Sequence, residues 1–163
     1  MGKYLLSLLA CLVAMGTAFS ALAEQVTGPV SAQVVRVVDG DTLLVNARPW
    51  PQQIVEVYVR LRGIDAPEIR SSCETTRSAG ERAQDALESL ISGRVVHLTN
   101  IDGDKYFGRV LADVRMEDGT NVSTYLVTQG LVLGYDGGKR KVSVCPSQAS
   151  YDPTRPSDFD DSQ

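Results

Sequence analysis

Apolar and polar side chains alternate with a period of two through residues 53–62, and strand-forming apolar residues flank D-G-D at 39–41, which together predict β-strands. We expect two strands within 33–46, on either side of the D-G-D sequence at 39–41, and a third strand over 53–62. A loop is expected at R-P-W-P (48–51), because proline removes a backbone donor and fixes its own φ angle. The inward face of the third strand is expected to carry Val55, Val57, Val59 and Leu61.

A helical period replaces this alternation over residues 78–91. Ser78 and Glu81 match a capping box, in which the serine caps the first turn and the glutamate reaches back to it. Apolar residues then recur at helical spacing, and Gly93 is typical of a helix end. The apolar stripe consists of Ala79, Ala83, Ala86, Leu87, Leu90 and Ile91.

The remaining pattern predicts strands over 95–99 and 110–116 and a second short helix over 123–127, capped by Ser123 and ended by Gly130. Strands come before and after the main helix rather than alternating with helices, which favours an α+β fold. Five short strands and two helices predict a mainly β structure, a small Greek-key barrel whose openings the helices cover.

The first 23 residues have the pattern of a secretory signal peptide. Lys3 supplies a positive charge, residues 4–18 are apolar, and A-L-A at 21–23 is a cleavage site. The apolar stretch is shorter than the roughly 20 residues that span a membrane. A lipoprotein signal at Cys11 is the alternative, but cleavage there would leave an apolar N-terminus. We therefore expect an exported protein, either periplasmic or secreted.

Removal of residues 1–23 leaves 140 of the 163 residues, a size that supports one domain with a real core. We expect that domain over 24–145 and a disordered acidic tail, rich in Pro, Ser and Asp, over 146–163. Loss of Lys3 changes the formal net charge from −4 to −5. Because the chain is acidic, any binding of nucleic acid must depend on locally placed arginines.

Cys73 and Cys145 remain after signal cleavage. Two cysteines in an exported chain favour a single disulfide over a metal pair or a catalytic thiol. The sequence does not fix the distance between them, so the pairing stays a hypothesis.

Two short segments place carboxylates directly after strand patterns. Asp39 and Asp41 flank a glycine, and Asp65 and Glu68 belong to G-I-D-A-P-E (63–68), where the proline stiffens the chain. Carboxylate and carbonyl oxygens in a stiff loop suit a hard cation such as calcium or magnesium. Each segment taken alone is more typical of a polar turn.

A third segment, D-K-Y-F-G-R (104–109), is typical of a hairpin when it is taken alone, with Gly108 supplying unusual backbone angles and Arg109 solvated. The single histidine, His97, alternates with apolar residues in a strand pattern. We interpret it as a surface or packed residue rather than a catalytic base.

The order and spacing of the three segments resemble the staphylococcal nuclease (thermonuclease) family. D-G-D-T, V-R-L-R-G-I-D-A-P-E, D-K-Y-F-G-R-V-L-A and the helix end V-T-Q-G-L follow one another within residues 33–136. The resemblance implies an OB-fold barrel and a phosphodiesterase that uses one calcium ion to act on DNA and RNA.

The resemblance also implies roles for individual positions. Arg60 and Arg109 match the two arginines that clamp the phosphate, and Glu68 matches the glutamate that positions or deprotonates the attacking water. The implied metal site consists of Asp41, Asp65 and the backbone carbonyl of Ala66, with Asp39 and Thr42 beside it. The implied nucleotide-binding residues are Lys105, Tyr106, Phe107 and Tyr135.

These residue types suit the hydrolysis of a phosphodiester. A divalent cation polarises the non-bridging oxygens and orients water. The fixed fork of arginine binds phosphate oxygens in pairs and stays charged. A glutamate within reach of the water serves as its base.

Three features depart from the best-known member of the family. We expect the folded part of the chain to end soon after 135–139 without a third helix, D-K-Y-F-G-R has one more residue than the corresponding turn, and the mature charge is acidic. Cys73 and Cys145 resemble the cysteines of shorter exported relatives, which favours the disulfide. We expect a monomer that prefers single-stranded or frayed DNA and RNA and does not associate with membranes after signal cleavage.

Two other functions stay open at this point. One is a non-catalytic OB-fold module that binds single-stranded nucleic acid through a basic groove and aromatic platforms. The other is a structural role in which all three segments are turns. Binding without cleavage would favour the first, and the absence of both would favour the second.

Overall fold

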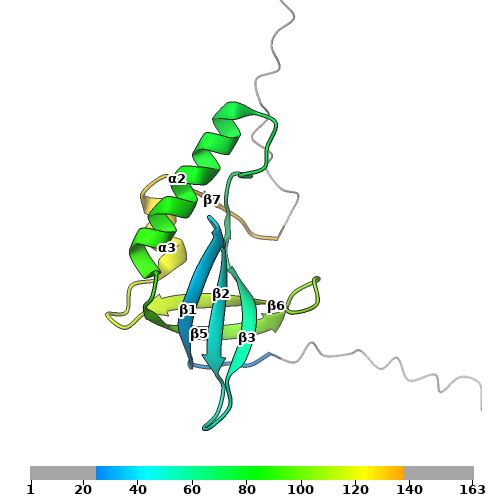
Figure 1. Ribbon diagram of the computed structural model, residues 1–163, viewed down its shortest axis with the longest axis vertical. Coiled ribbons are helices and arrows are strands. Elements are labelled where there is room, and N and C mark those ends of the chain that lie inside the picture. The colour runs from blue at the N-terminus through cyan, green and yellow to red at the C-terminus, as the bar shows by residue number, and fades with distance from the viewer. Residues whose placement is uncertain (1–24, 138–163) are drawn as a thin grey trace, which may run out of the picture.

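The computed structural model describes residues 25–137, whose strands and helices are shown in Figure 1. The strands are β1 (Val30–Asp39), β2 (Thr42–Arg48), β3 (Val55–Leu61), β4 (Ile64–Asp65), β5 (Val95–Gly103), β6 (Arg109–Met116) and β7 (Leu133–Gly134). The helices are α2 (Glu74–Ile91) and α3 (Val122–Thr128). The expected signal peptide, the acidic tail and Cys145 lie outside the described residues.

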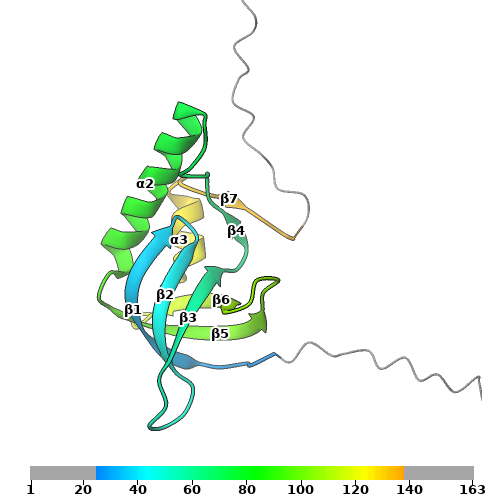
Figure 2. The same ribbon diagram turned by 45° about the vertical axis from the view of Figure 1, so that its right-hand side comes forward.

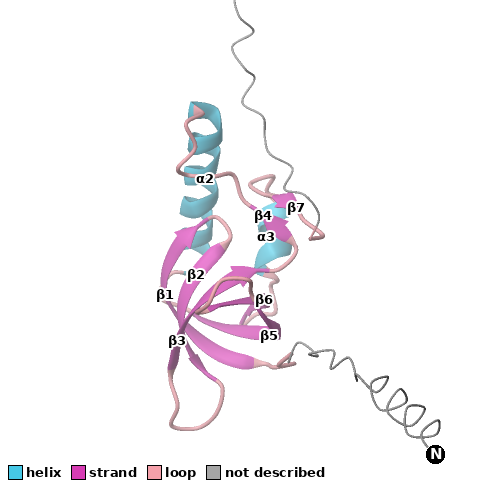
Figure 3. Cartoon of the chain, turned by 90° about the vertical axis from the view of Figure 1, so that its right-hand side faces the viewer, coloured by secondary structure: helices cyan, strands magenta, loops and turns pink. Residues whose placement is uncertain are grey.

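Five strands close into a barrel in the order β1-β2-β3-β6-β5, with β5 pairing back to β1. β3 and β6 run parallel, and the other neighbouring pairs of the barrel are antiparallel. β4 and β7 form a separate two-stranded sheet. Figures 2 and 3 show this small sheet and both helices at one end of the barrel. The predicted mainly β barrel with helices over an opening is confirmed.

Alternating side chains from the strands fill the barrel, and α2 closes one end with its apolar stripe. Burial of each large aliphatic side chain stabilises the fold by roughly 1.5–3 kcal/mol. The fully buried members include Leu43, Val45, Val59, Leu61, Val96, Leu98 and Val114 from the strands and Ala83, Leu87 and Ile91 from α2.

Val55 does not face inward as predicted, since its side chain is 43% exposed. Val59 and Leu61, further along the same strand, are fully buried as expected. Figure 1 shows the reason, because the hairpin between β2 and β3 projects beyond the barrel. The predicted alternation of β3 thus assigns the correct residues to the inward face, but Val55, at the start of the strand, lies beyond the core and stays exposed.

The prediction that Ser78 caps the main helix is wrong. α2 begins at Glu74, with Cys73 as the N-cap residue and no side-chain cap. The backbone N–H of Arg77 donates to Cys73 O, and Arg77 forms an ion pair with Glu74. This first turn is polar and largely solvated, so the apolar stripe that begins at Ala79 did not reveal it.

The second helix also begins earlier than predicted. Its N-cap is Asn121, whose side chain accepts a hydrogen bond of 2.9 Å from the backbone N–H of Thr124. Ser123, the predicted cap, instead donates to Arg62 O at 2.9 Å and ties α3 to the end of β3. The predicted helix ends are confirmed, since Gly93 and Gly130 both follow their helices with a φ of 66°.

No helix within residues 25–137 combines the length and apolar character that crossing a membrane requires.

Candidate active site

Asp41 is the buried centre of the D-G-D-T segment, with 2% of the residue exposed. Its Oδ1 accepts from Thr42 Oγ1 at 2.9 Å and from Arg60 Nη1 at 2.6 Å, and its Oδ2 accepts from Ala66 N at 2.9 Å. Asp39 supports the turn, since its Oδ1 accepts from Asp41 N at 3.0 Å. A buried carboxylate with three donors is satisfied and fixed in place.

Gly40 is required by close packing rather than by an unusual backbone angle. It is not among the glycines with positive φ. A Cβ atom at this position would lie 2.7 Å from Ala83 Cβ and 2.9 Å from Ala66 Cβ. The turn that carries Asp41 therefore packs directly on α2 and on the loop that carries Ala66.

α2 holds both acidic segments against the barrel. A Cβ atom at Gly80 would lie 2.6 Å from Pro67 O and 2.9 Å from Ile69 Cγ2, so the helix approaches the second segment as closely as the first. Gln84 Nε2 donates to Val38 O at 3.0 Å, next to the first segment. Sequence reasoning missed these contacts and assigned Gly80 to a capping box. The available signal was the run of small residues on one face of the helix.

Arg60 joins the two acidic segments. Its Nη1 lies 2.6 Å from Asp41 Oδ1, and its Nη2 lies 3.0 Å from Asp65 Oδ1. The side chains of Asp41, Arg60 and Asp65 are only 3%, 17% and 12% exposed, so solvent screens these pairs weakly. Burial, and then the negative charge of Asp41, raise the pKa of Asp39 above its usual value. The structure thus brings Arg60, which was predicted to clamp the phosphate, together with the residues predicted at or beside a metal: Asp39, Asp41, Thr42, Asp65 and Ala66.

The possible ligand atoms of this cluster are oxygens, the kind of ligand that a hard cation prefers. Carboxylate oxygens of Asp41 and Asp65 already converge on the positive guanidinium of Arg60, and calcium and magnesium prefer oxygen ligands. Within residues 25–137, no three His, Cys, Asp or Glu side chains are grouped to hold a metal ion. An ion at this place would therefore complete its shell with carbonyl and water oxygens. Asp41, Asp65 and the carbonyl of Ala66 are the residues that could hold it.

A second cluster occupies the hairpin that precedes and begins β6. Arg109 Nε lies 2.6 Å from Asp104 Oδ2, and the Arg109 Cζ lies 4.6 Å from the centre of the Tyr106 ring. Lys105 Nζ lies 5.0 Å from the same ring centre. Phe107 is fully exposed at the tip of the hairpin.

The two clusters are electrostatic neighbours. Burial alone would raise the pKa of Asp104, but the hydrogen bond and charge of Arg109 outweigh it, and the charge of Arg60 acts in the same direction. The pKa of Asp104 is therefore held below its usual value. Parallel pairing of β3 with β6 explains this, because Arg109 lies opposite Tyr58, two residues before Arg60.

Glu68 and Tyr135 lie on two loops that the sheet of β4 and β7 brings together. Glu68 is exposed, and its Oε1 accepts from Arg70 N at 3.3 Å. Asp65 pairs with Leu133 across this sheet, and Tyr135 N donates to Gly63 O at 2.9 Å. Sequence reasoning placed Tyr135 at the site without a strand to hold it there, because two-residue strands leave no alternation to detect.

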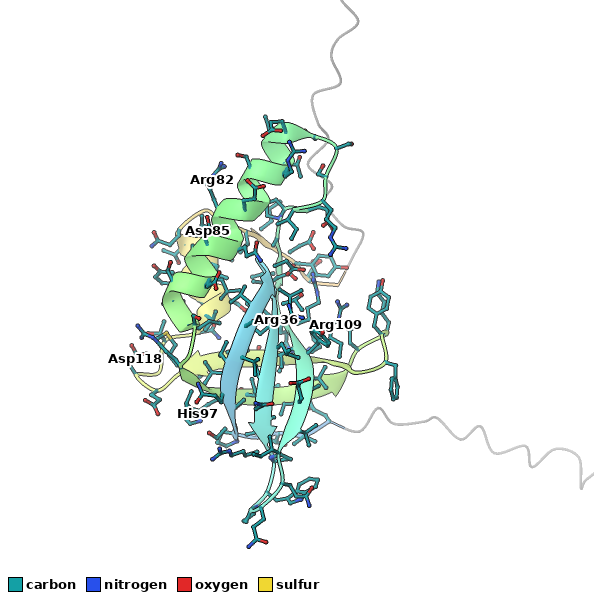
Figure 4. The ribbon with its side chains drawn as sticks, viewed as in Figure 1. Arg36, Arg82, Asp85, His97, Arg109 and Asp118 are labelled. Carbon is teal, nitrogen blue, oxygen red and sulfur yellow. The ribbon has the colours of Figure 1, made fainter. Side chains whose placement is uncertain are left out.

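His97 lies away from both clusters. It is half-buried in β5 and opposite Arg115, towards the other end of β6 from Arg109. Figure 4 labels both His97 and Arg109 and shows this separation. The interpretation of His97 as a surface or packed residue is consistent with its position.

The fold and the clusters together define a class, a small five-stranded barrel that presents two arginines and buried carboxylates beside helices. The family model of the staphylococcal nuclease homologues matches residues 58–144, which is more than half of the chain. The chain therefore belongs to this family.

Several curated proteins are similar to this chain over about two thirds of its length. An uncharacterized endonuclease of Escherichia coli is 34% identical over 108 residues, which covers 66% of this chain and 62% of the relative. The uncharacterized endonuclease of Escherichia coli O157:H7 shows the same identity and coverage. Protein ParB of Escherichia coli is 37% identical over 113 residues, covering 63% of this chain and 56% of the relative. The match thus spans about three fifths of the length of these relatives.

Proposed function

We propose that this chain is a calcium-dependent nuclease that hydrolyses phosphodiester bonds in DNA and RNA. The observation that carries the proposal is the guanidinium of Arg60 held between Asp41 and Asp65, one strand away from the guanidinium of Arg109. Membership of the staphylococcal nuclease homologue family and the endonuclease names of two relatives support it.

The two arginines are assigned to the phosphate. Charge develops on the non-bridging oxygens during hydrolysis, and fixed cationic donors lower the energy of that state most. Arg60 is held rigidly by its carboxylates, and Arg109 is held by Asp104 and Tyr106. Both therefore enter the reaction already oriented, which limits the entropy that binding the phosphate must cost.

Glu68 is assigned to the attacking water as its base, because it is the exposed carboxylate of the second segment and needs only hydrogen-bond reach of that water. Asp41, Asp65 and the carbonyl of Ala66 are assigned to one calcium ion, with Asp39 and Thr42 fixing Asp41. A bound calcium ion would polarise the phosphate oxygens and orient the water. Lys105, Tyr106, Phe107 and Tyr135 are assigned to the nucleotide.

The test is cleavage of DNA and of RNA by the purified protein, first with calcium and then with a chelator. We expect cleavage with calcium, none with the chelator, and a loss of about 10²–10⁴-fold in rate for Glu68→Gln. Glu68 is exposed, so the variant should unfold at the same temperature as the wild type. Absence of calcium-dependent cleavage by the folded protein would refute the proposal.

The non-catalytic single-strand-binding function is a separate outcome of the same experiment. The exposed Tyr106 and Phe107 beside Arg109 favour it as the second candidate, since aromatic and cationic side chains bind single strands. Binding of an oligonucleotide without turnover, by the wild type in calcium, would select it.

We also propose export, a monomeric state and a preference for single-stranded or frayed substrates. The pattern of residues 1–23 supports export to the periplasm or the medium. Cys73, buried at the start of α2, is the proposed partner of Cys145 in a disulfide. Mass spectrometry of the exported protein, with and without reductant, tests both the cleavage after Ala23 and the disulfide.

A further inference from the structure

Arg36 and Tyr58 lie on the outer face of the barrel beside the candidate active site. Arg36 pairs with Leu44, Leu44 pairs with Tyr58, and Tyr58 pairs with Arg109. Paired residues on neighbouring strands share a face of the sheet, so these side chains form one row that ends at Arg109. Three strand spacings separate Arg36 from Arg109, or about 14 Å.

A bulge in β1 turns Arg36 towards this face. Val34 and Val37 are both buried in the barrel, although residues three apart in a regular strand point to opposite faces. The register shift between Val34 and Arg36 removes the conflict and leaves Val35 and Arg36 both exposed. Bulges of this kind re-aim side chains and are common next to active sites.

Arg36 and Tyr58 contact each other across the buried Leu44. Arg36 Nη2 donates to Tyr58 Oη at 3.2 Å, and its Cζ lies 5.8 Å from the centre of the ring. The contact orients the ring while Tyr58 stays 39% exposed. A base can therefore stack on it.

Arg36 differs from the two arginines in the clusters in its ion pairing. Among residues 25–137, Arg60 and Arg109 each form ion pairs with carboxylates, whereas Arg36 has only the tyrosine hydroxyl as a side-chain partner. Its remaining N–H groups can bind phosphate oxygens without first breaking an ion pair. In an acidic protein, such a local cation supplies the attraction that the net charge does not.

We infer that Arg36 and Tyr58 form a further nucleotide subsite, which holds a single-stranded polynucleotide next to the phosphate bound by Arg109. Tyr58 stacks on a base, and Arg36 contacts a phosphate of the same strand. This subsite rests on the proposed nuclease function and extends it along the face formed by β1, β2 and β3. The corresponding face of OB-folds is used for oligonucleotides.

The test compares a substrate that can reach the row with one that cannot. The first is a single-stranded oligonucleotide, and the second is a nitrophenyl ester of one nucleotide. We expect Tyr58→Ala and Arg36→Ala each to raise the KM for the oligonucleotide about 10-fold, with kcat unchanged. Neither variant should alter hydrolysis of the nitrophenyl ester. Tyr58→Phe keeps the ring and should stay close to the wild type.

Matched controls separate the row from general surface effects. Tyr125 in α3 is 38% exposed, almost the same as Tyr58, so Tyr125→Ala removes an equally exposed ring elsewhere. Arg82→Ala removes an exposed arginine from α2, and Figure 4 shows Arg82 on that helix and Arg36 over the barrel strands. Both controls should leave the KM for the oligonucleotide unchanged.

A binding experiment separates failure of the subsite from failure of the proposed function. In the Glu68→Gln background, the affinity for a labelled oligonucleotide in calcium should fall about 10-fold on adding Tyr58→Ala or Arg36→Ala. The same loss of affinity is expected even if the wild type cleaves no substrate. That result would refute the nuclease function and leave the subsite standing. Unchanged affinity and KM in folded variants, or an equal loss on both substrates, would overturn the subsite. If Tyr58→Ala does not fold, the KM and the oligonucleotide affinity of Arg36→Ala, a change at an exposed residue, test the subsite alone.

Discussion

Two aspartate–arginine clusters lie side by side in this protein, and they are built differently. Arg60 is held by Asp41, in the turn between β1 and β2, and by Asp65, in β4, and residues next to these two carboxylates pack on α2. Arg109 is held by Asp104, five residues away in one hairpin whose aromatic side chains are exposed. The first cluster depends on the whole fold, whereas the second depends mainly on a local turn. The same pair of residue types can therefore contribute to stability in one place and, in the proposed nuclease, to substrate contact in the other.

The largest effect is expected for Arg60→Ala. The change leaves Asp41 buried without its cation, so the free energy of unfolding should fall by about 3–5 kcal/mol. The rate of cleavage should fall by about 10²–10³-fold. Urea unfolding and cleavage assays measure the two effects, with Arg82→Ala as the control on an exposed arginine. Calcium should restore part of the lost stability, because it supplies a positive charge to the same carboxylates. Stability equal to that of the wild type would contradict the role of Arg60 in holding the loops together.

Arg109→Ala should separate activity from stability. Loss of a phosphate-binding cation should lower cleavage by about 10²-fold. The free energy of unfolding should fall by less than for Arg60→Ala, because Arg109 pairs with one carboxylate of its own hairpin and does not join separate segments of the fold. The same two assays apply, and a stability loss as large as that of Arg60→Ala would remove the distinction between the clusters.

Gly40→Ala tests the packing beneath the first cluster. The added methyl group would clash with Ala83 Cβ and Ala66 Cβ, so the free energy of unfolding should fall by about 1–3 kcal/mol. Gly103→Ala is the matched control, since a Cβ atom there has no neighbour within 4 Å and its φ is not positive. Thermal unfolding of the two variants measures the difference, and equal stability would show that α2 does not press on the turn.

A smaller effect is expected from the pH dependence of the second cluster. The pKa of Asp104 is lower in the folded chain than in the unfolded chain, so its ionisation stabilises the fold. This contribution is present above the unfolded pKa of about 3.9 and is lost as the pH falls through the lower folded pKa. Wild type should therefore exceed Asp104→Asn in stability at pH 7, and the gap should close in acid. Urea unfolding over a pH series measures the gap, and a gap independent of pH would contradict the ionic origin.

The smallest effect on the fold is expected for Phe107→Ala. The side chain is fully exposed, so the unfolding temperature should not change. Any effect should be confined to the affinity for oligonucleotides, where one stacked ring contributes about 1–3 kcal/mol. Fluorescence titration measures the affinity, with Tyr106→Ala for comparison because that ring also contacts Arg109. A fall in stability would show that the hairpin packs on another part of the protein.

The sequence predicted the parts of this site that depend on residue type and order. Two of the motifs that carry the family resemblance predict that Asp41, Arg60 and Asp65 belong to one site, and the fold brings them within hydrogen-bond distance. The alternation of Val59 and Leu61 likewise predicted their burial, because one face of a strand must meet the core.

Features that depend on close approach or on irregular backbone were not predictable in the same way. The role of Gly40 follows from a contact with α2, a helix more than thirty positions along the chain. The exposure of Arg36 follows from a bulge in β1, and the periodicity of the sequence does not reveal where a strand carries an extra residue. The start of α2 at Glu74 was missed because a solvated first turn carries no apolar stripe.

The most direct test of the account is the calcium dependence of single-turnover cleavage in the wild type, Asp65→Asn and Arg109→Lys. The wild type should cleave a single-stranded oligonucleotide at a rate that saturates with calcium. Asp65→Asn should require a higher calcium concentration for half-maximal rate, because it removes a carboxylate from the proposed calcium site. Arg109→Lys should lower the maximal rate and leave the half-maximal calcium concentration unchanged. Cleavage that does not depend on calcium, or an equal shift of the calcium requirement in both variants, would contradict the division of roles between the two clusters.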